Sequence, residues 1–340
     1  MPDTRHADAL AVGVLAAVAL VAAATFRDYG LGWDDYTHAQ YGQLLLDFYS
    51  SGFRDTRAFS FVNLYRYGGG FDLAAALLAK ALPFGLFETR RLLGAAVGLI
   101  GLVAVWRLGR RAGGPLAGLL ALVLLATCPL YYGHMFMNPK DAPFAAMMAV
   151  ALLGTVRALD EYPHPRPATV LLLGLGFGLS IGSRILGGFA VVGALLAVAL
   201  VVAAEGRVQG MRHAATRLGN FLRGVLPALA IALAAMALVW PSSVLDVRNV
   251  PRAVLYFSQF FEKPWRELYG GELILATEMP RSYVPLLLGL KLPEILLALG
   301  VAGLIWSLVT VGQRTLPAER RAIFLSIALA ASLPVAVALV

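Results

Sequence analysis

The sequence has a single cysteine, Cys128, which lies within an apolar run. No internal disulfide can therefore form, and a metal site built from thiolates is not expected. Charged residues are also scarce, since Asp, Glu, Lys and Arg make up only 14% of the 340 residues. The chain contains no HExxH, P-loop, GxSxG or dinucleotide-binding signature. The enzyme classes that these four motifs define are therefore not indicated.

Apolar residues dominate instead, and they make up 59% of the chain. They form repeated runs of roughly eighteen residues, which is typical of an integral membrane protein built from helices. The net charge of +8 does not indicate a nucleic-acid partner, because the arginines lie between apolar segments and no soluble basic domain is visible. The ten-residue alternation of a membrane β-barrel is also missing, so no strands are predicted.

The pattern predicts an all-α polytopic membrane protein with about nine spans. The first span would be retained, although Arg5, the run that follows it and Ala22–Ala24 also resemble a cleavable signal peptide. No repeat divides the chain, so residues 1–340 are predicted to form one domain, and its C-terminal part is expected to be missing. The predicted spans are 9–26, 92–109, 115–133, 142–159, 168–182, 188–204, 221–240, 293–311 and 322–340.

Segment 71–87 is ambiguous, because it is largely apolar but contains Asp72, Lys80 and Pro83. The arginines argue that it does not cross. Without this crossing, four connections lie on the same side of the membrane: 107–115, 157–167, 205–223 and 312–321. They carry nearly all arginines of the short loops, as the positive-inside rule requires. The N-terminus would then be cytoplasmic in an inner (plasma) membrane, and 71–87 would lie on the outer surface as an interfacial or re-entrant helix.

Two long outer loops, 27–91 and 241–292, follow from this topology. In the first, Tyr41, Leu44, Leu45 and Phe48 give segment 36–49 one apolar helical face. The second is rich in rings that suit the headgroup layer. These aromatic residues are Tyr256, Phe257, Phe260, Phe261, Trp265 and Tyr269.

Adjacent carboxylates, Asp34 and Asp35, stand where the chain leaves the first span. Charge is costly beside lipid unless it caps, pairs or does chemistry. One acid could cap the helix that follows, and this leaves the other free for a functional role. His38 lies four residues after Asp34 and could face it on a helix, although a lone histidine is more often structural.

Basic residues occur on the same predicted side as these acids. Lys140 and Asp141 follow an Asn-Pro turn, and Asp141 could simply cap the next span. Arg184 and Arg281 could be interfacial arginines that reach toward water. Together, Lys140, Arg184 and Arg281 could instead hold a phosphate at the membrane surface, with Tyr283 beside Arg281.

The order of these motifs resembles the GT-C superfamily of membrane glycosyltransferases that use polyprenyl-phosphate sugars. Glycosyltransferase family thirty-nine, with its protein O-mannosyltransferases and aminoarabinose transferases, is the nearer branch. Its first outer loop begins with an Asp-Glu pair, which Trp33-Asp34-Asp35 resembles with Asp in place of Glu. The start of the family's second span is resembled by Glu88-Thr89-Arg90-Arg91-Leu92. Later motifs of the family are resembled by segment 138–144, by Arg184 and by the Pro-Arg-x-Tyr-x-Pro stretch at 280–285.

The resemblance implies a sugar donor linked through phosphate to a polyprenol, and an acceptor that is a lipid, a glycan or a protein. Asp34 would be the general base, with Asp35 secondary and Asp141 orienting Lys140 or the acceptor. Lys140 and Arg184 would hold the phosphate, and His38, Arg281 and Tyr283 would contribute to substrate binding. No metal or other cofactor is demanded. The alternative functions are a transporter or lipid flippase, whose polar residues lie near the midplane, and a non-catalytic assembly subunit.

Overall fold

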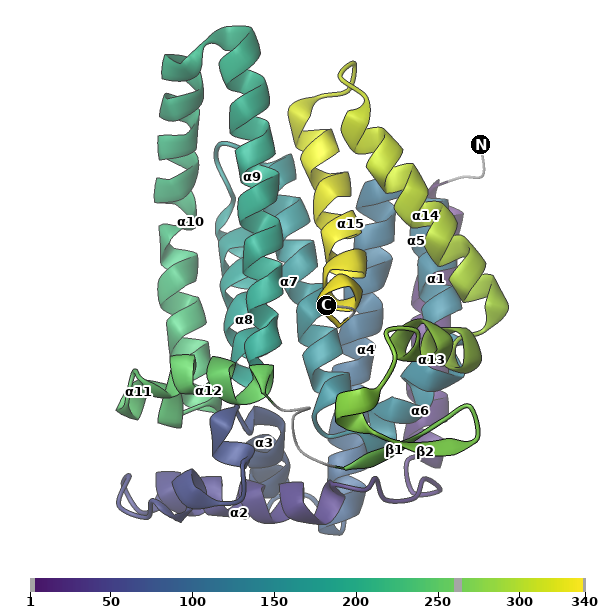
Figure 1. The fold of residues 1–340 in the computed structure, drawn as a ribbon, viewed down its shortest axis with the longest axis vertical. Helices are drawn as coiled ribbons and strands as arrows, with labels where there is room; N and C mark the ends of the chain where they lie inside the picture. Colours follow the sequence, from purple (N-terminus) through teal and green to yellow (C-terminus); the bar gives the residue numbers. More distant parts are fainter. Residues whose placement is uncertain (1–3, 260–264, 339–340) are drawn as a thin grey trace.

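The computed structural model describes residues 4–259 and 265–338. It confirms the predicted class, because these residues form a bundle of long apolar helices with one small β-hairpin (Figure 1). The long helices are α1 (Thr4–Thr25), α4 (Leu86–Gly113), α7 (Asp141–Asp160), α9 (Gly188–Gln209), α10 (Met211–Val239), α14 (Glu294–Gly312) and α15 (Ala318–Ala338). The shorter ones are α2 (Asp35–Ser50), α3 (Gly70–Leu78), α5 (Pro115–Ala126), α6 (Pro129–Met137), α8 (Pro167–Ser183), α11 (Ser242–Leu245), α12 (Asn249–Ser258) and α13 (Tyr283–Lys291).

The predicted count of nine spans is too high. In the described ranges, seven helices are long and apolar enough to cross a membrane, and α5 with α6, bent by 60°, makes an eighth if the pair is one span. The remaining predicted span, 168–182, corresponds to α8, which has only 17 residues. Glycines let α8 pack closely between its neighbours, since a Cβ at Gly176 would overlap α7 and one at Gly178 would overlap α10.

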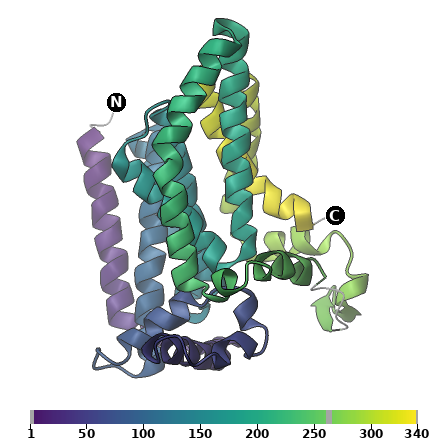
Figure 2. The same ribbon diagram turned by 90° about the vertical axis from the view of Figure 1, so that its left-hand side faces the viewer.

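The connection expected at 205–223 is mostly helical, which corrects a second prediction. Helix α10 begins at Met211 rather than near residue 221, and the chain reverses at Gly210, whose φ is +90°. A positive φ is readily adopted only by glycine, which explains the tight turn. The arginines of this segment lie on helices, and the α9–α10 hairpin projects beyond the other helices (Figure 2).

All four arginine-rich connections lie at the end of the bundle opposite α2 (Figure 1). Ion pairs tie this end together, as when Arg110 donates to Asp8 at 2.7 Å and Arg217 approaches Glu205 at 2.7 Å. The short connections α6–α7 and α8–α9 lie at the other end, which we call the α2 face (Figure 1). The basic connections therefore share one end, in agreement with the prediction from the arginines.

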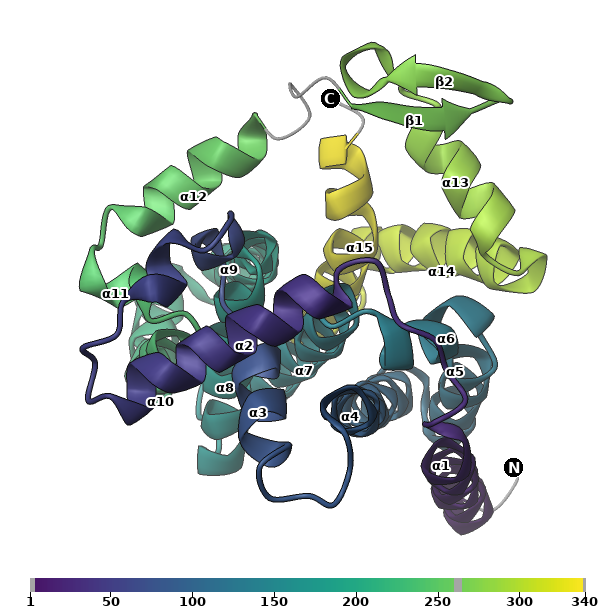
Figure 3. The same cartoon turned by 90° about the horizontal axis from the view of Figure 1, so that it is seen from below.

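Helices α2 and α3 cover the α2 face, where α2 lies across the ends of the membrane-spanning helices (Figure 3). The predicted apolar side of α2 is turned inward, with Tyr41, Leu45 and Phe48 buried. Helix α3 falls within the ambiguous segment, and its nine residues reach only about 13.5 Å, too short to cross the hydrocarbon core. The chain therefore returns to the bundle on the side from which it left.

The second long loop contains strands, which the sequence pattern did not predict. Strands β1 (Arg266–Tyr269) and β2 (Glu272–Leu275) pair antiparallel, with Tyr269 opposite Glu272. Gly270 and Gly271 both have positive φ, which is the requirement of a two-residue hairpin turn. Four-residue strands are too short to show a readable alternation. Phe260 and Phe261 lie outside the described residues.

Candidate active site

Acidic and basic side chains from three elements meet at the α2 face. Asp34 precedes α2, Lys140 and Asp141 begin α7, and Arg184 follows α8. The Nζ atom of Lys140 lies 3.7 Å from an Asp34 carboxylate oxygen, and Arg184 forms an ion pair with Asp141. We call these four residues the carboxylate–cation cluster. The structure thus brings together four of the residues that the sequence predicted for the site.

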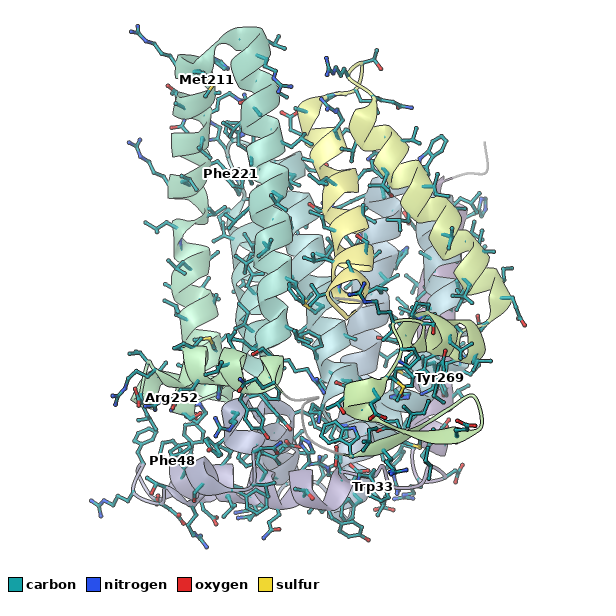
Figure 4. The ribbon with its side chains drawn as sticks, in the orientation of Figure 1. Trp33, Phe48, Met211, Phe221, Arg252 and Tyr269 are labelled. Carbon is teal, nitrogen blue, oxygen red and sulfur yellow. The ribbon has the colours of Figure 1, made fainter. Side chains whose placement is uncertain are left out.

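Asp34 occupies the N-cap position of α2, but its side chain makes no capping hydrogen bond. Its side chain is 54% exposed and its only described partner is Lys140. Trp33, beside it, is fully exposed at the same face (Figure 4). The Asp34 side chain therefore does not cap α2, and its carboxylate is open to solvent.

Asp35 points the other way and is buried. One carboxylate oxygen accepts a hydrogen bond from the backbone N–H of Gly32 at 2.6 Å, and the other lies 3.6 Å from Nε of Arg90. Asp35 therefore fixes the turn that carries Asp34. The two adjacent acids therefore have different surroundings, because Asp34 is exposed and Asp35 is buried.

Beneath α2 lies a set of ionisable side chains that we call the buried charge network: Asp35, His38, Asp72 and Arg90. Asp72 accepts hydrogen bonds at 2.7 Å from both His38 Nδ1 and the Arg90 guanidinium. All four residues are at most 5% exposed. The pairing of His38 with Asp34, expected from their spacing, is not made, because the ring lies on the inner side of α2 and bonds to Asp72 instead.

Asp72 and Arg90 were not among the predicted site residues. The available signal was an acid within an apolar segment and an arginine at the start of a span, since such charges are rare in membrane proteins and usually paired. Their partners could not be read from the sequence, because His38 lies 34 residues from Asp72 along the chain.

Asn138 organises the turn that presents Lys140 and Asp141. Its side-chain oxygen accepts hydrogen bonds from the backbone N–H groups of Lys140, at 3.2 Å, and Asp141, at 2.7 Å. Its amide nitrogen lies 3.2 Å from an Asp141 oxygen and 3.0 Å from His134 Nδ1. The side chain thus uses its full hydrogen-bonding capacity to fix the Asn-Pro turn.

Tyr67 lies next to the carboxylate–cation cluster, although the sequence pattern did not single it out. Lys140 Nζ is 5.4 Å from the centroid of its ring, a cation–π contact. Burial raises the pKa of the Tyr67 hydroxyl, while the positive charge of Arg184 acts in the opposite direction. Asp34 and Asp141 also raise this pKa, so charges of the cluster act on one phenol from several sides.

The stretch 280–285 is not brought to the cluster by any described contact. Arg281 is exposed and makes no hydrogen bond or ion pair with any residue in the described ranges. Tyr283 packs within its own loop, with its ring 6.0 Å from that of Tyr269, which Figure 4 labels beside the β-hairpin. In residues 4–259 and 265–338, no group of three or more His, Cys, Asp or Glu side chains is arranged to hold a metal ion.

Comparisons with known proteins bear on the family and the fold of this chain. Residues 74–242, just under half of the chain, match the family described as dolichyl-phosphate-mannose-protein mannosyltransferase. A sequence comparison with curated proteins finds no significant match.

Two solved structures share the fold. The apo oligosaccharyltransferase of Archaeoglobus fulgidus is 14% identical, with a TM-score of 0.56 over 97% of this chain and 50% of its own. ArnT of Cupriavidus metallidurans, bound to undecaprenyl phosphate, is 19% identical, with a TM-score of 0.52 over 95% of this chain and 59% of its own. The chain thus spans roughly half of each of these proteins. In its family match over residues 74–242 and in its fold, this multi-pass membrane protein is similar to the GT-C superfamily of glycosyltransferases.

Proposed function

We propose that this protein transfers a sugar from a polyprenyl-phosphate donor to an acceptor on the α2 face, at the carboxylate–cation cluster. The observation that carries the proposal is the meeting of Asp34 with Lys140 and of Asp141 with Arg184, from three separate elements. A phosphate at a membrane surface needs more than one cation, and both cations here stand beside an exposed carboxylate. ArnT, which shares the fold, was crystallised with undecaprenyl phosphate.

The reaction needs little beyond a base and a place for negative charge. The bond between the anomeric carbon and the phosphate oxygen breaks, and its electron pair remains on the lipid phosphate. The acceptor oxygen forms the new bond to the same carbon, and its proton passes to a carboxylate. Because a phosphate is a good leaving group, no strong general acid is required.

The geometry favours Asp34 over Asp35 as the base. Asp34 is exposed and paired only with Lys140, whereas Asp35 is buried against Gly32 and Arg90. Lys140 would leave Asp34 and move to the donor phosphate when the donor binds. This exchange would free the Asp34 carboxylate for the acceptor proton at the moment when the phosphate arrives.

Arg184 and Asp141 complete the proposed phosphate site. Arg184 supplies a planar guanidinium, which suits bidentate phosphate contact better than an ammonium group does. Asp141, held by Asn138, keeps Arg184 in place before the donor binds. Donor binding replaces one carboxylate partner of the arginine by phosphate oxygens, so the guanidinium stays paired throughout. The acceptor would approach from the side of Trp33, which is fully exposed.

The test supplies the purified protein with a panel of labelled polyprenyl-phosphate sugars and a cell-envelope extract as acceptor, and follows release of polyprenyl phosphate. We expect Asp34→Asn to fold and bind undecaprenyl phosphate but to lose turnover by about 10²–10⁴-fold. Lys140→Ala and Arg184→Ala should instead weaken binding of undecaprenyl phosphate, since a charged hydrogen bond is worth about 1.5–3 kcal/mol.

The matched control is Asp28→Asn, because Asp28 is an exposed aspartate in the same loop, outside the cluster. It should turn over like the wild type. Near-normal turnover of Asp34→Asn would move the role of base to another carboxylate. No release of polyprenyl phosphate from any sugar in the panel would contradict the proposed donor class.

A further inference from the structure

A groove runs between α9 and α10 on the side of the bundle away from the candidate active site. Its volume is about 780 Å³, and nine of its ten lining residues are apolar or glycine. Among them are Leu195, Val198 and Val202 of α9, and Leu218 and Leu222 of α10. Leu195 and Leu222 are more than half exposed. The groove is therefore an open apolar surface feature and not part of the packed core.

One end of the groove is charged. Arg207 is its only charged lining residue, and it lies near the turn of the α9–α10 hairpin together with Met211 (Figure 4). Arg207 is exposed and makes no hydrogen bond or ion pair within the described residues. Arg212 and His213, just past the turn, are exposed as well.

Glu205, two residues before Arg207, does not pair with it. Glu205 is buried, where Arg217 approaches it at 2.7 Å and the Tyr162 hydroxyl donates to it at 3.3 Å. Arg217 also lies 3.5 Å from Glu319, so both acids pair with this one arginine and not with Arg207. The turn between α9 and α10 therefore carries an excess of positive charge at one end of the apolar groove.

The dimensions fit one leaflet of a bilayer. From Leu195 to Arg207 the helix rises by about 18 Å at 1.5 Å per residue. Half of the hydrocarbon core is about 15 Å thick. The apolar end lies deeper along membrane-spanning helices, and the cation lies at the tip. An amphiphile with one anionic head and a chain as long as a leaflet matches both ends at once.

We propose that this groove binds an anionic phospholipid, with its phosphate beside Arg207 and an acyl chain along Leu195 and Leu222. Basic pockets between membrane helices commonly hold anionic headgroups. The site is separate from the carboxylate–cation cluster, which lies at the opposite end of the bundle (Figure 1). The lipid would hold the projecting hairpin against the membrane, and it is not a substrate.

The experiment incubates the purified full chain in detergent with equal amounts of phosphatidylglycerol and phosphatidylcholine that carry the same acyl chains. Native mass spectrometry then counts the lipids that remain bound. We expect the wild type to retain phosphatidylglycerol preferentially. Arg207→Gln should lower its retention about fivefold and leave phosphatidylcholine unchanged, since a surface arginine near anionic lipid contributes roughly that factor.

Two further variants sharpen the result. Arg314→Gln is the matched control, because Arg314 is an exposed arginine in another connection at the same end of the bundle. It should behave like the wild type. Ala199→Phe places a ring in the exposed groove and should displace the lipid without removing a charge. Equal retention of the two lipids by the wild type, or unchanged retention in both Arg207→Gln and Ala199→Phe, would overturn the proposal. Neither outcome depends on glycosyl transfer.

Discussion

Replacing Asp72 with alanine should destabilise the protein strongly, because the change leaves two buried donors without their acceptor. Asp72 is 2% exposed and accepts from His38 and Arg90, each at 2.7 Å. Removing one partner of a buried ion pair costs about 3–5 kcal/mol. Asp35, at 3.6 Å from Arg90, is too far to replace the lost contact fully. We therefore expect a loss near 3 kcal/mol or more.

The assay is reversible unfolding of the purified protein in mixed micelles, as the fraction of sodium dodecyl sulfate is raised. Asp47→Ala, on the neighbouring helix α2, is the matched control. Asp47 pairs with Arg57 at 3.2 Å, and both side chains are partly or largely exposed, so its loss should cost about 0–1 kcal/mol. Similar losses for Asp72→Ala and Asp47→Ala would refute the reasoning.

A second variant keeps the test decisive if Asp72→Ala does not fold. The double variant Asp72→Ala, Arg90→Met removes both charges of the closer pair and keeps a long side chain in the bundle. Asp35 loses only its 3.6 Å contact with Arg90 and keeps its hydrogen bond from the Gly32 backbone N–H. Because the main penalty is an unpaired buried charge, the double variant should be more stable than Asp72→Ala alone. A double variant that is less stable than the single one would show that the network stabilises α2 by packing rather than by charge.

Three further predictions concern the surroundings of the cluster. Asn138→Ala should weaken binding of undecaprenyl phosphate at least tenfold, because each hydrogen bond from Asn138 to the turn before α7 is worth about 1 kcal/mol. Unchanged affinity would exclude a role for Asn138 in positioning Lys140 and Asp141. Tyr67→Phe should remove one tyrosine that ionises well above the ordinary pKa of 10 in a spectrophotometric titration. Because the folded-state pKa is raised, the stability that Tyr67 contributes is complete below pH 10 and is lost as the pH rises further, so the variant should lose less stability at alkaline pH. Gly68→Ala should lower the free energy of unfolding by about 1–3 kcal/mol, because the added Cβ would overlap the carbonyl oxygen of Gly182 near the end of α8. Gly133→Ala is the control and should be tolerated, because open space surrounds Gly133.

The sequence alone determined which segments are apolar enough to cross and which side of the helix at 36–49 faces the protein. Local periodicity carries this information, so α2 and its buried Tyr41, Leu45 and Phe48 were predictable. The arginines fixed the grouping of the connections, because their positions relative to the spans can be read directly. Turn residues also act locally, and the turn at Asn138 follows from an Asn-Pro dipeptide. The spans were overcounted at α8, where close glycine packing allows a helix of only 17 residues.

Only the tertiary structure decided which ionisable groups meet. Asp34 and Asp35 are adjacent in the sequence, yet the direction of the turn at Gly32 exposes Asp34 and buries Asp35 against Arg90. His38 pairs with Asp72 rather than Asp34, because α3 packs beneath α2 and brings a distant carboxylate to the inner side of the helix. A side-chain period states which face of a helix is buried. It carries no information about the element packed against that face, which depends on how the whole chain folds.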